Sequence, residues 1–168
     1  TVELDNLKLA LGFEGHLLDE SGQNNNCYGA IKIPQTISKF PFDDDENDYG
    51  GNPSLPTLTG TRTIVSGKVN NAFSFDGSSY ITFNKESNYD FERTTYFTIT
   101  YWKKQPTNAA NAGIISKRTS VTGNGWGIHT DTSGFETLSL TNTNSTNELV
   151  VRYAVDTADD VWHHFAWI

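Results

Sequence analysis

The chain has 168 residues, 36% of them hydrophobic and 12% aromatic, with no methionine and a net charge of −8. This length favours one domain, and a core rich in Phe, Tyr and Trp suits strands better than helices. The negative net charge disfavours nucleic-acid and anionic-membrane partners. The sequence contains no run of about 20 apolar residues, so membrane insertion is not predicted. Cys27 is the single cysteine, which excludes an intrachain disulfide framework.

The first predicted strand covers residues 7–13, where Leu and Phe alternate with Lys, Ala and Gly. A polar loop follows at residues 19–26, and a short strand at residues 30–33 is stopped by Pro34. Residues 34–61 hold four of the five prolines and the acidic cluster at 43–48. Because so long a structureless loop is uncommon in a compact domain, we interpret this segment as an insertion over one edge of the sheets.

The stretch FSFDGSSYITF at residues 73–83 predicts two short strands joined by a tight turn at Asp76-Gly77. Asp76 is expected to form the turn and not to bind a ligand. Further strands are predicted, with turn residues between them, at residues 63–65, 97–102, 113–117, 126–130, 138–141, 149–155 and 162–168. Short strands at this spacing predict an all-β domain, either a sandwich or a jelly roll.

Six stretches in order resemble the laminin-G-like branch of the concanavalin A-like lectin and glucanase superfamily. They are LKLALGFEGHLLDESGQNN (7–25), VSGKVNNAFSFDGSSYITF (65–83), FTITYWKKQP (97–106), IISKR (114–118), GWGIHT (125–130) and VWHHFAWI (161–168). The resemblance implies a single domain over residues 1–168, a two-sheet antiparallel β-sandwich of the jelly-roll type. In that family a hairpin and a last strand follow the stretch resembling 161–168, so we expect this chain to lack its last strands.

The same resemblance points to calcium at Asp19, which lies in the loop that helps to hold the ion in calcium-binding family members. Calcium takes six to eight oxygen ligands, so carbonyl groups and the side chain of Asn24 or Asn26 would have to complete the site. The alternative is that Asp19 accepts hydrogen bonds from its own loop in an Asx turn.

The acidic cluster offers a weaker metal motif. Asp43, Asp45 and Asn47 have the spacing of the first half of an EF-hand loop, but the sixth position is Asp48 where that loop needs Gly, and no Glu stands at position twelve. A solvated acidic loop is the favoured interpretation.

Aromatic side chains are the candidates for stacking on sugar rings. Four tryptophans fall within predicted strands and are expected mostly in the core, so Tyr28 and Tyr49, in predicted loops, are the better ligand-binding candidates, together with Asn24 and Asn26. The tryptophans are Trp102, Trp126, Trp162 and Trp167. The neighbours His163 and His164 should point to opposite faces of a strand, which suits a scaffold better than a metal site.

No catalytic motif is evident. The chain has no Glu-x-Asp-x-Glu strand of the glucanase type, no Gly-x-Ser-x-Gly elbow and no phosphate loop.

We therefore expect a non-enzymatic module that binds a glycan or surface polysaccharide, or adheres to a surface, on a secreted, cell-surface or phage-particle protein. The alternative is a structural, decoration or assembly domain of a virion or fibre, with other protein subunits as partners and no glycan binding. Either function places the protein outside the cell, on the cell surface or on a virion.

Overall fold

A computed structural model describes residues 9–11, 17–19, 36–91, 94, 96–107, 111–118, 123–143 and 147–168. The chain divides into two compact units, Thr1–Thr36 and Ile37–Ile168. In the first unit, β1 (Leu9–Leu11) pairs antiparallel with β2 (Leu17–Asp19), which places Leu9 opposite Asp19. The strand predicted at residues 30–33 lies outside the described residues.

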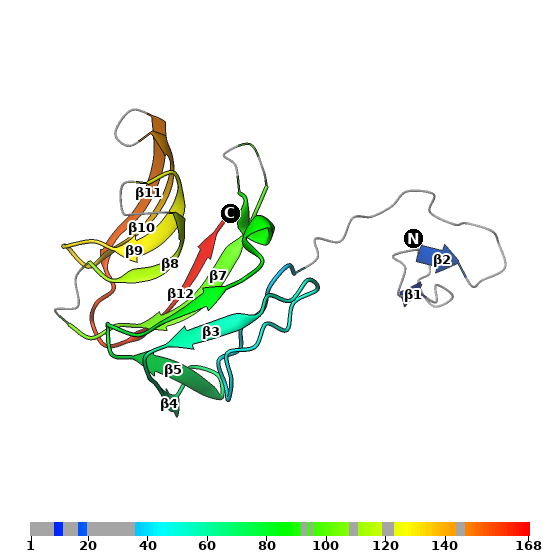
Figure 1. Cartoon of the computed structure of the whole chain (residues 1–168), viewed down its shortest axis with the longest axis horizontal. Helices are drawn as coiled ribbons and strands as arrows, with labels where there is room; N and C mark the ends of the chain where they lie inside the picture. Colours follow the sequence, from blue (N-terminus) through cyan, green and yellow to red (C-terminus); the bar gives the residue numbers. More distant parts are fainter. Residues whose placement is uncertain are drawn as a thin grey trace, which may run out of the picture. The chain divides into compact units, whose positions relative to one another are not determined.

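The largest sheet of the second unit is four-stranded and antiparallel, in the order β11-β10-β9-β8 (Figure 1). Its members are β8 (Gly113–Arg118), β9 (Gly125–Thr130), β10 (Phe135–Thr143) and β11 (Asn147–Asp156). All four strands were predicted as short runs between turn residues, although β10 and β11 are longer than the predicted 138–141 and 149–155. The alternation gives the sheet one apolar face, which carries Ile128 and Leu138, and one polar face.

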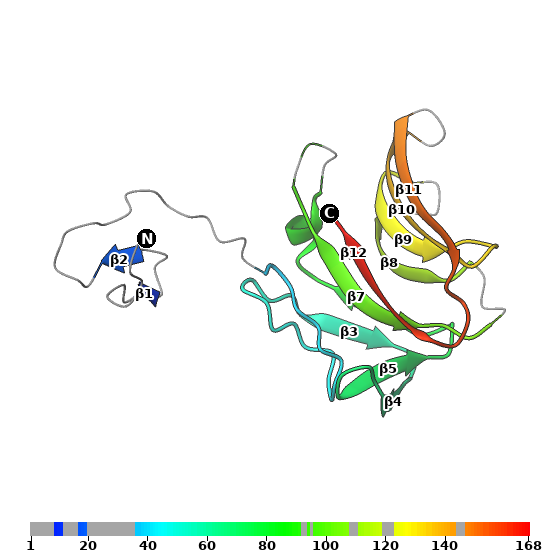
Figure 2. The same ribbon diagram turned by 180° about the vertical axis from the view of Figure 1, so that it is seen from behind.

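The apolar face packs on a second antiparallel pair, β7 (Ile99–Lys104) and β12 (Trp162–Trp167) (Figure 2). Ile128 and Leu138 from the sheet form one buried cluster with Phe165 and Trp167 from β12. Two sheets facing each other across this core give the all-β fold a sandwich-like character.

The hairpin predicted at residues 73–83 is wrong in its pairing. Both strands exist, but β5 (Asn71–Phe75) pairs with β4 (Arg62–Ser66), and β6 (Tyr80–Phe83) pairs with β3 (Pro56–Thr59). This pairing places Ile64 opposite Phe73 and Leu58 opposite Ile81. The Asp76-Gly77 turn forms as predicted, because the Asp76 carboxylate accepts hydrogen bonds from the backbone N–H groups of Ser78 and Ser79 at 2.9 Å each.

The segment predicted as a loop at residues 34–61 is shorter in the structure, since β3 begins at Pro56. Proline is tolerated at the first residue of a strand because a missing N–H costs little there. The residues before β3 are held by aromatic contacts, with the Phe40 ring 4.3 Å from Phe83 and the Phe42 ring 5.1 Å from Phe73. The segment before β3 is therefore packed on β5 and β6.

One buried carboxylate organises that segment. Asp48 is 8% exposed and accepts hydrogen bonds from the backbone N–H groups of Lys39, Gly50 and Ser54 at 2.8–2.9 Å. Although burial opposes ionisation, these three bonds hold the pKa of Asp48 below its ordinary value. Asp48 thus supplies the acceptors that a strandless backbone needs.

Helical structure is minor in the described part of the chain. Among the described residues it is limited to the short 3-10 helix η2 (Glu86–Tyr89), which follows β6. None of the described residues forms a helix of the length and apolarity that a membrane crossing requires.

Candidate binding face

The polar face of the four-stranded sheet collects polar and charged side chains from β8, β9, β10 and β11. Residues directly opposite each other on neighbouring strands share a face, so the register defines rows across it. His129 is paired with Gly113 and with Thr137, and Thr137 is paired with Arg152. The next two rows are Ser116, Gly127, Ser139, Val150 and then Arg118, Gly125, Thr141, Glu148.

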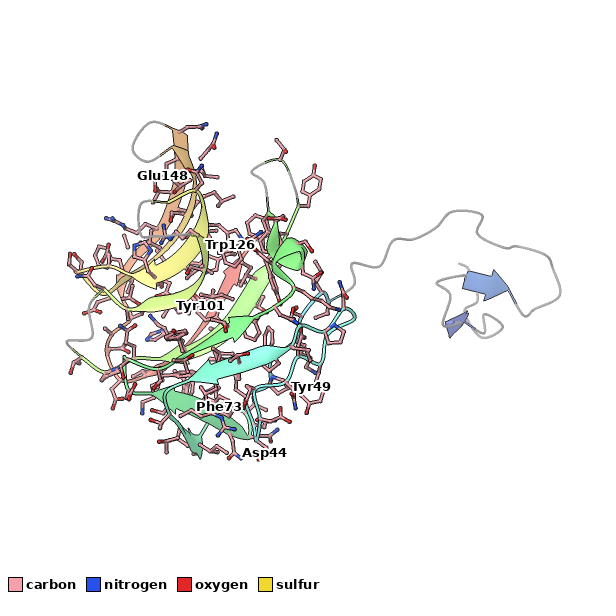
Figure 3. All side chains as sticks on the ribbon, viewed as in Figure 1. Asp44, Tyr49, Phe73, Tyr101, Trp126 and Glu148 are labelled. Carbon is pink, nitrogen blue, oxygen red and sulfur yellow. The ribbon has the colours of Figure 1, made fainter. Side chains whose placement is uncertain are left out.

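An open hollow of about 700 Å3 lies on this face. Its lining comes from all three rows and includes Arg118, His129, Thr137, Arg152 and Glu148. Glu148 projects from β11 and is labelled in Figure 3. Small-molecule sites occupy roughly 300–1,000 Å3, so the hollow has the size of a ligand site.

Arg118 is held flat against the sheet. Its Nη1 donates to the Ser139 hydroxyl at 3.1 Å. A Cβ atom placed on Gly127 would lie 2.6 Å from Arg118 Nη2, so the guanidinium occupies the space that any other residue at 127 would fill. Gly127 therefore fixes the height of this cation above the floor of the hollow.

The other charged groups at the hollow have partners of their own. Arg152 Nε lies 3.3 Å from Asp131 Oδ2, and Glu148 Oε1 accepts a hydrogen bond from the Thr141 hydroxyl at 3.1 Å. These contacts orient both side chains but leave Arg152 53% exposed.

Two polar atoms of one row are buried and lack a hydrogen-bond partner among the described residues, His129 Nδ1 and Thr137 Oγ1. Thr137 is only 3% exposed. The pKa of His129 is lowered, first by burial and then by the charge of Arg118, with a smaller contribution from Arg152 against the opposing charges of Asp131 and Glu136. Its imidazole is therefore neutral near pH 7 and can both donate and accept a hydrogen bond.

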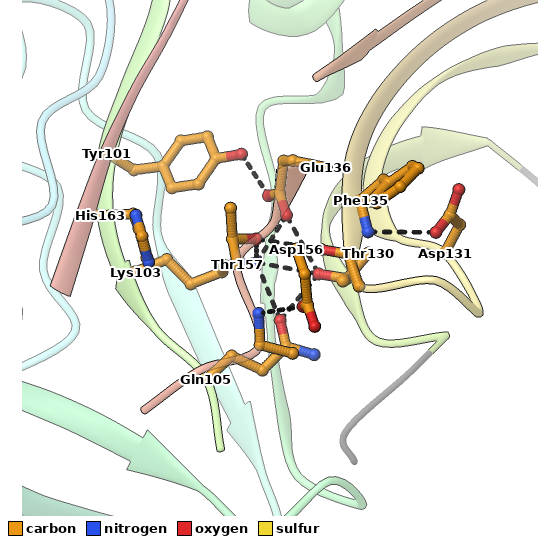
Figure 4. A network of polar contacts seen from close by, with 12 residues as sticks. Tyr101, Lys103, Gln105, Thr130, Asp131, Phe135, Glu136, Asp156, Thr157 and His163 are labelled. Atoms are coloured by element: carbon orange, nitrogen blue, oxygen red, sulfur yellow. Dashed lines mark hydrogen bonds and ion pairs between the residues drawn. The ribbon is translucent and has the colours of Figure 1, made fainter. Parts of the chain in front are cut away.

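A closed polar network lies on the opposite side of the same sheet (Figure 4). Lys103 Nζ contacts Glu136 Oε2 at 2.5 Å, Gln105 Oε1 at 2.8 Å and Thr130 Oγ1 at 2.9 Å. The Tyr101 hydroxyl donates to Glu136 Oε1 at 2.5 Å, and burial, followed by this bond, raises the pKa of Tyr101. Lys103 and Glu136 are 8% and 0% exposed, so this network belongs to the scaffold.

The sequence candidates do not converge in the described residues. Tyr49 is 59% exposed, as its loop prediction implied, and its hydroxyl donates to Asp45 Oδ2 at 2.9 Å. Asp19 is the last residue of β2, and its side chain is not described. Asn24, Asn26 and Tyr28 lie outside the described residues.

In the part of the chain that the structure describes, no group of three or more His, Cys, Asp or Glu side chains could hold a metal ion. The acids with EF-hand spacing bind donors of the chain itself. Asp43 accepts from the backbone N–H of Asn71 at 3.2 Å and Asp45 from that of Asn47 at 3.0 Å. The prediction of a solvated loop is wrong for Asp48, because its side chain is buried and accepts hydrogen bonds from three backbone N–H groups.

Two of the tryptophans confirm the core prediction, since Trp126 and Trp167 are 3% and 8% exposed. Trp102 departs from it. At 45% exposure it packs against the ring of His164, and the Lys68 ammonium lies 5.5 Å from its ring centre. His164 and His163 have separate contacts, as predicted for neighbours on a strand, because His163 bonds Asp159 at 2.9 Å.

The residues that line the hollow were not among the sequence candidates. A signal for part of them was available, because polar residues at alternate positions of β10, Thr137, Ser139 and Thr141, mark one face of a sheet. Comparisons with protein-family models, with curated proteins and with solved structures gave no match.

Proposed function

We propose that this chain is a non-catalytic carbohydrate-binding module with a jelly-roll sandwich, and that the glycan binds in the hollow on the polar face. The observation that carries the proposal is the polar lining of this open hollow, in which His129 and Thr137 each keep one buried side-chain atom, Nδ1 and Oγ1, without a described partner. Sugar hydroxyls donate and accept hydrogen bonds, so they match a neutral imidazole and a threonine hydroxyl.

An apolar ligand suits the hollow less well. It would remove water from exposed polar groups of the lining such as Arg152 without replacing their hydrogen bonds, and each polar group buried without a partner costs about 1–3 kcal/mol. Hydroxyls of Ser116 and Ser139 add further donors and acceptors to the lining. The chemistry of the lining thus favours a polyhydroxyl ligand.

The absence of catalysis is part of the proposal. Glycoside hydrolysis generally uses two carboxyl groups on either side of the scissile bond. Among the described lining residues Glu148 is the carboxylate, and it is bonded to the Thr141 hydroxyl. A module of this kind would act outside the cell, on the cell surface or on a virion.

The second candidate function is an assembly domain of a virion or fibre. It is favoured by β11, the end strand of its sheet, whose side chains Leu149, Val151, Tyr153 and Val155 are 45–50% exposed. An apolar strand at a sheet edge is a template for pairing with another chain. This function requires no glycan.

A glycan array with variants at Gly113 tests the first proposal. Gly113 lines the hollow, and a Cβ atom there would meet nothing within 4 Å, so Gly113→Phe should fill the hollow without displacing the sheet. We expect the native protein and the control Gly113→Ala to bind the same saccharides, and Gly113→Phe to lose at least tenfold in affinity with an unchanged melting temperature. Native protein without a single saccharide hit, or full binding by Gly113→Phe, would overturn the proposal.

Calcium at Asp19 stays a prediction attached to this function. If the ion binds the folded chain, excess calcium should raise the melting temperature relative to a chelator, and Asp19→Asn should remove the difference. Equal melting temperatures in calcium and chelator would contradict it.

A further inference from the structure

The outer edge of β11 is long and apolar. The strand has ten residues, ends the four-stranded sheet and pairs on its other side with β10 (Figure 1). Its large apolar side chains are 45–50% exposed, namely Leu149, Val150, Val151, Tyr153 and Val155. Natural sheets protect such an edge with Lys, Pro, a bulge or a covering segment, and β11 contains neither Lys nor Pro. The edge is therefore suited to pairing with a strand of another chain.

The middle of β11 is regular. Residues 148–153 pair with β10 without interruption, and the register shifts of that pair lie beyond both ends of this stretch. A stretch without a bulge keeps its outward N–H and C=O groups in line for a further strand. Its side chains alternate, so that Glu148, Val150 and Arg152 share the polar face, whereas Leu149 and Val151 share the apolar face.

A second copy of β11 is complementary to this stretch. Two copies related by a two-fold axis perpendicular to the sheet pair antiparallel, and residues opposite each other then belong to the same face. Pairing centred on Val150 puts the Glu148 of each copy opposite the Arg152 of the other, and Leu149 opposite Val151. Opposite charges at directly opposed positions stabilise a strand pair, whereas like charges destabilise it.

The charges of β11 favour this register over its neighbours. Centring the pair on Arg152 would oppose two arginines, and centring it on Leu149 or Val151 would leave both charges opposite uncharged residues. Arg152 Nε already lies 3.3 Å from Asp131, but the arginine side chain is 53% exposed, and a guanidinium has five N–H donors. Its outward donors are therefore accessible to a second carboxylate.

We propose that two copies of this chain pair through β11, antiparallel and centred on Val150, and join their four-stranded sheets into one continuous sheet. Both copies use the same edge, so this contact closes at a dimer and does not extend into a fibre. The inference goes beyond the carbohydrate function and does not depend on it. It also brings two hollows together, since Glu148, Val150 and Arg152 line the hollow of each copy and would meet at the two-fold axis.

Light scattering after gel filtration, over a range of protein concentrations, tests the proposal. We expect a species of twice the 18.7 kDa mass of the chain, with a fraction that rises with concentration. Glu148→Arg and Arg152→Glu should each weaken dimerisation by about tenfold or more, because like charges then oppose each other at two positions. An equimolar mixture of these two variants should restore the dimer, since every opposed pair then has opposite signs.

Rescue by mixing separates a lost contact from a folding defect. The double variant Glu148→Arg/Arg152→Glu should also dimerise, because it exchanges the two charges within one chain and restores both pairs. Lys104→Glu is the matched control and should dimerise like the native protein, since it reverses an exposed charge on β7, away from β11.

The outcomes decide the proposal independently of the glycan array. A native protein that stays monomeric at its highest soluble concentration would overturn it. So would single variants that dimerise like the native protein, or a mixture and a double variant that both remain monomeric. Species larger than a dimer would show that the edge does not close on itself and would equally contradict the two-fold pairing.

Discussion

Replacing Lys103 by Met removes one charge from the buried network and keeps most of the side-chain volume. The ammonium has four acceptor atoms within 3.2 Å but only three protons, so the network depends on it more than on any other donor. Without it, Glu136 keeps only the hydroxyls of Tyr101 and Thr130 as donors. The variant therefore leaves a carboxylate at 0% exposure without its cation.

Breaking a buried ion pair in this way costs about 3–5 kcal/mol, a large share of a total stability of about 5–15 kcal/mol. With a urea m-value of about 2 kcal/mol per M, the unfolding midpoint of Lys103→Met should fall by about 1.5–2.5 M. Removing both charges in Lys103→Met/Glu136→Leu should cost less than the sum of the single changes, because neither charge is then stranded. Some cost remains, since Tyr101, Gln105 and Thr130 lose partners.

Urea unfolding followed by tryptophan fluorescence measures all three variants. Lys104→Met is the matched control, because the neighbouring side chain is 41% exposed and its pair with Asp160, at 3.3 Å, is a surface pair worth about 0–1 kcal/mol. A loss below about 1 kcal/mol for Lys103→Met, or strictly additive single and double changes, would refute the reasoning that this network is a coupled scaffold.

Three further predictions follow from burial. Trp167→Ala should destabilise the protein by about 3–5 kcal/mol, and Trp102→Ala by much less, because their exposed fractions are 8% and 45%; similar midpoints in urea would contradict this. Asp48→Ala should expose the preceding segment to limited proteolysis, because three backbone N–H groups lose their acceptor; unchanged cleavage would argue against it. Because the pKa of His129 is lowered in the folded chain, the unfolded chain binds a proton on this imidazole more readily, and stability should fall as the pH drops below 6.5. His129→Asn should reduce that fall in melting experiments between about pH 7 and 5. A pH profile identical to that of the native protein would exclude this role.

Alternation predicted the strands well and their partners poorly. The positions of β8 to β12 follow from short strand-forming runs between turn residues, a signal that each strand carries by itself, although β10 (Phe135–Thr143) extends beyond the predicted 138–141. The pairing of β5 with β4 could not be read from the Asp76-Gly77 signal, because that turn forms equally well between strands of different pairs. Strand partners depend on contacts between distant residues such as Leu58 and Ile81.

The candidate site was harder to predict because it is a property of the sheet register. Arg118, His129, Thr137 and Arg152 lie on four strands, and only the register brings them to one face. Tyr49 was predicted to bind a ligand because it lies in a loop, but its hydroxyl donates a hydrogen bond to Asp45 of the same loop. A period-two search for polar positions would have found the polar face, but not the unpartnered atoms in its floor.

During folding, Glu136 lacks its cationic partner until the four-stranded sheet packs against β7. Until β7 brings Lys103 to it, the four-stranded sheet presents a carboxylate at one end of its apolar face, in the row next to Ile128 and Leu138. An inward-pointing charge of this kind makes stacking on a second copy of the same sheet unfavourable, since the carboxylate would be trapped without a cation. We therefore expect Glu136 to disfavour stacking on a second copy and Lys103 to favour the sheet that carries it.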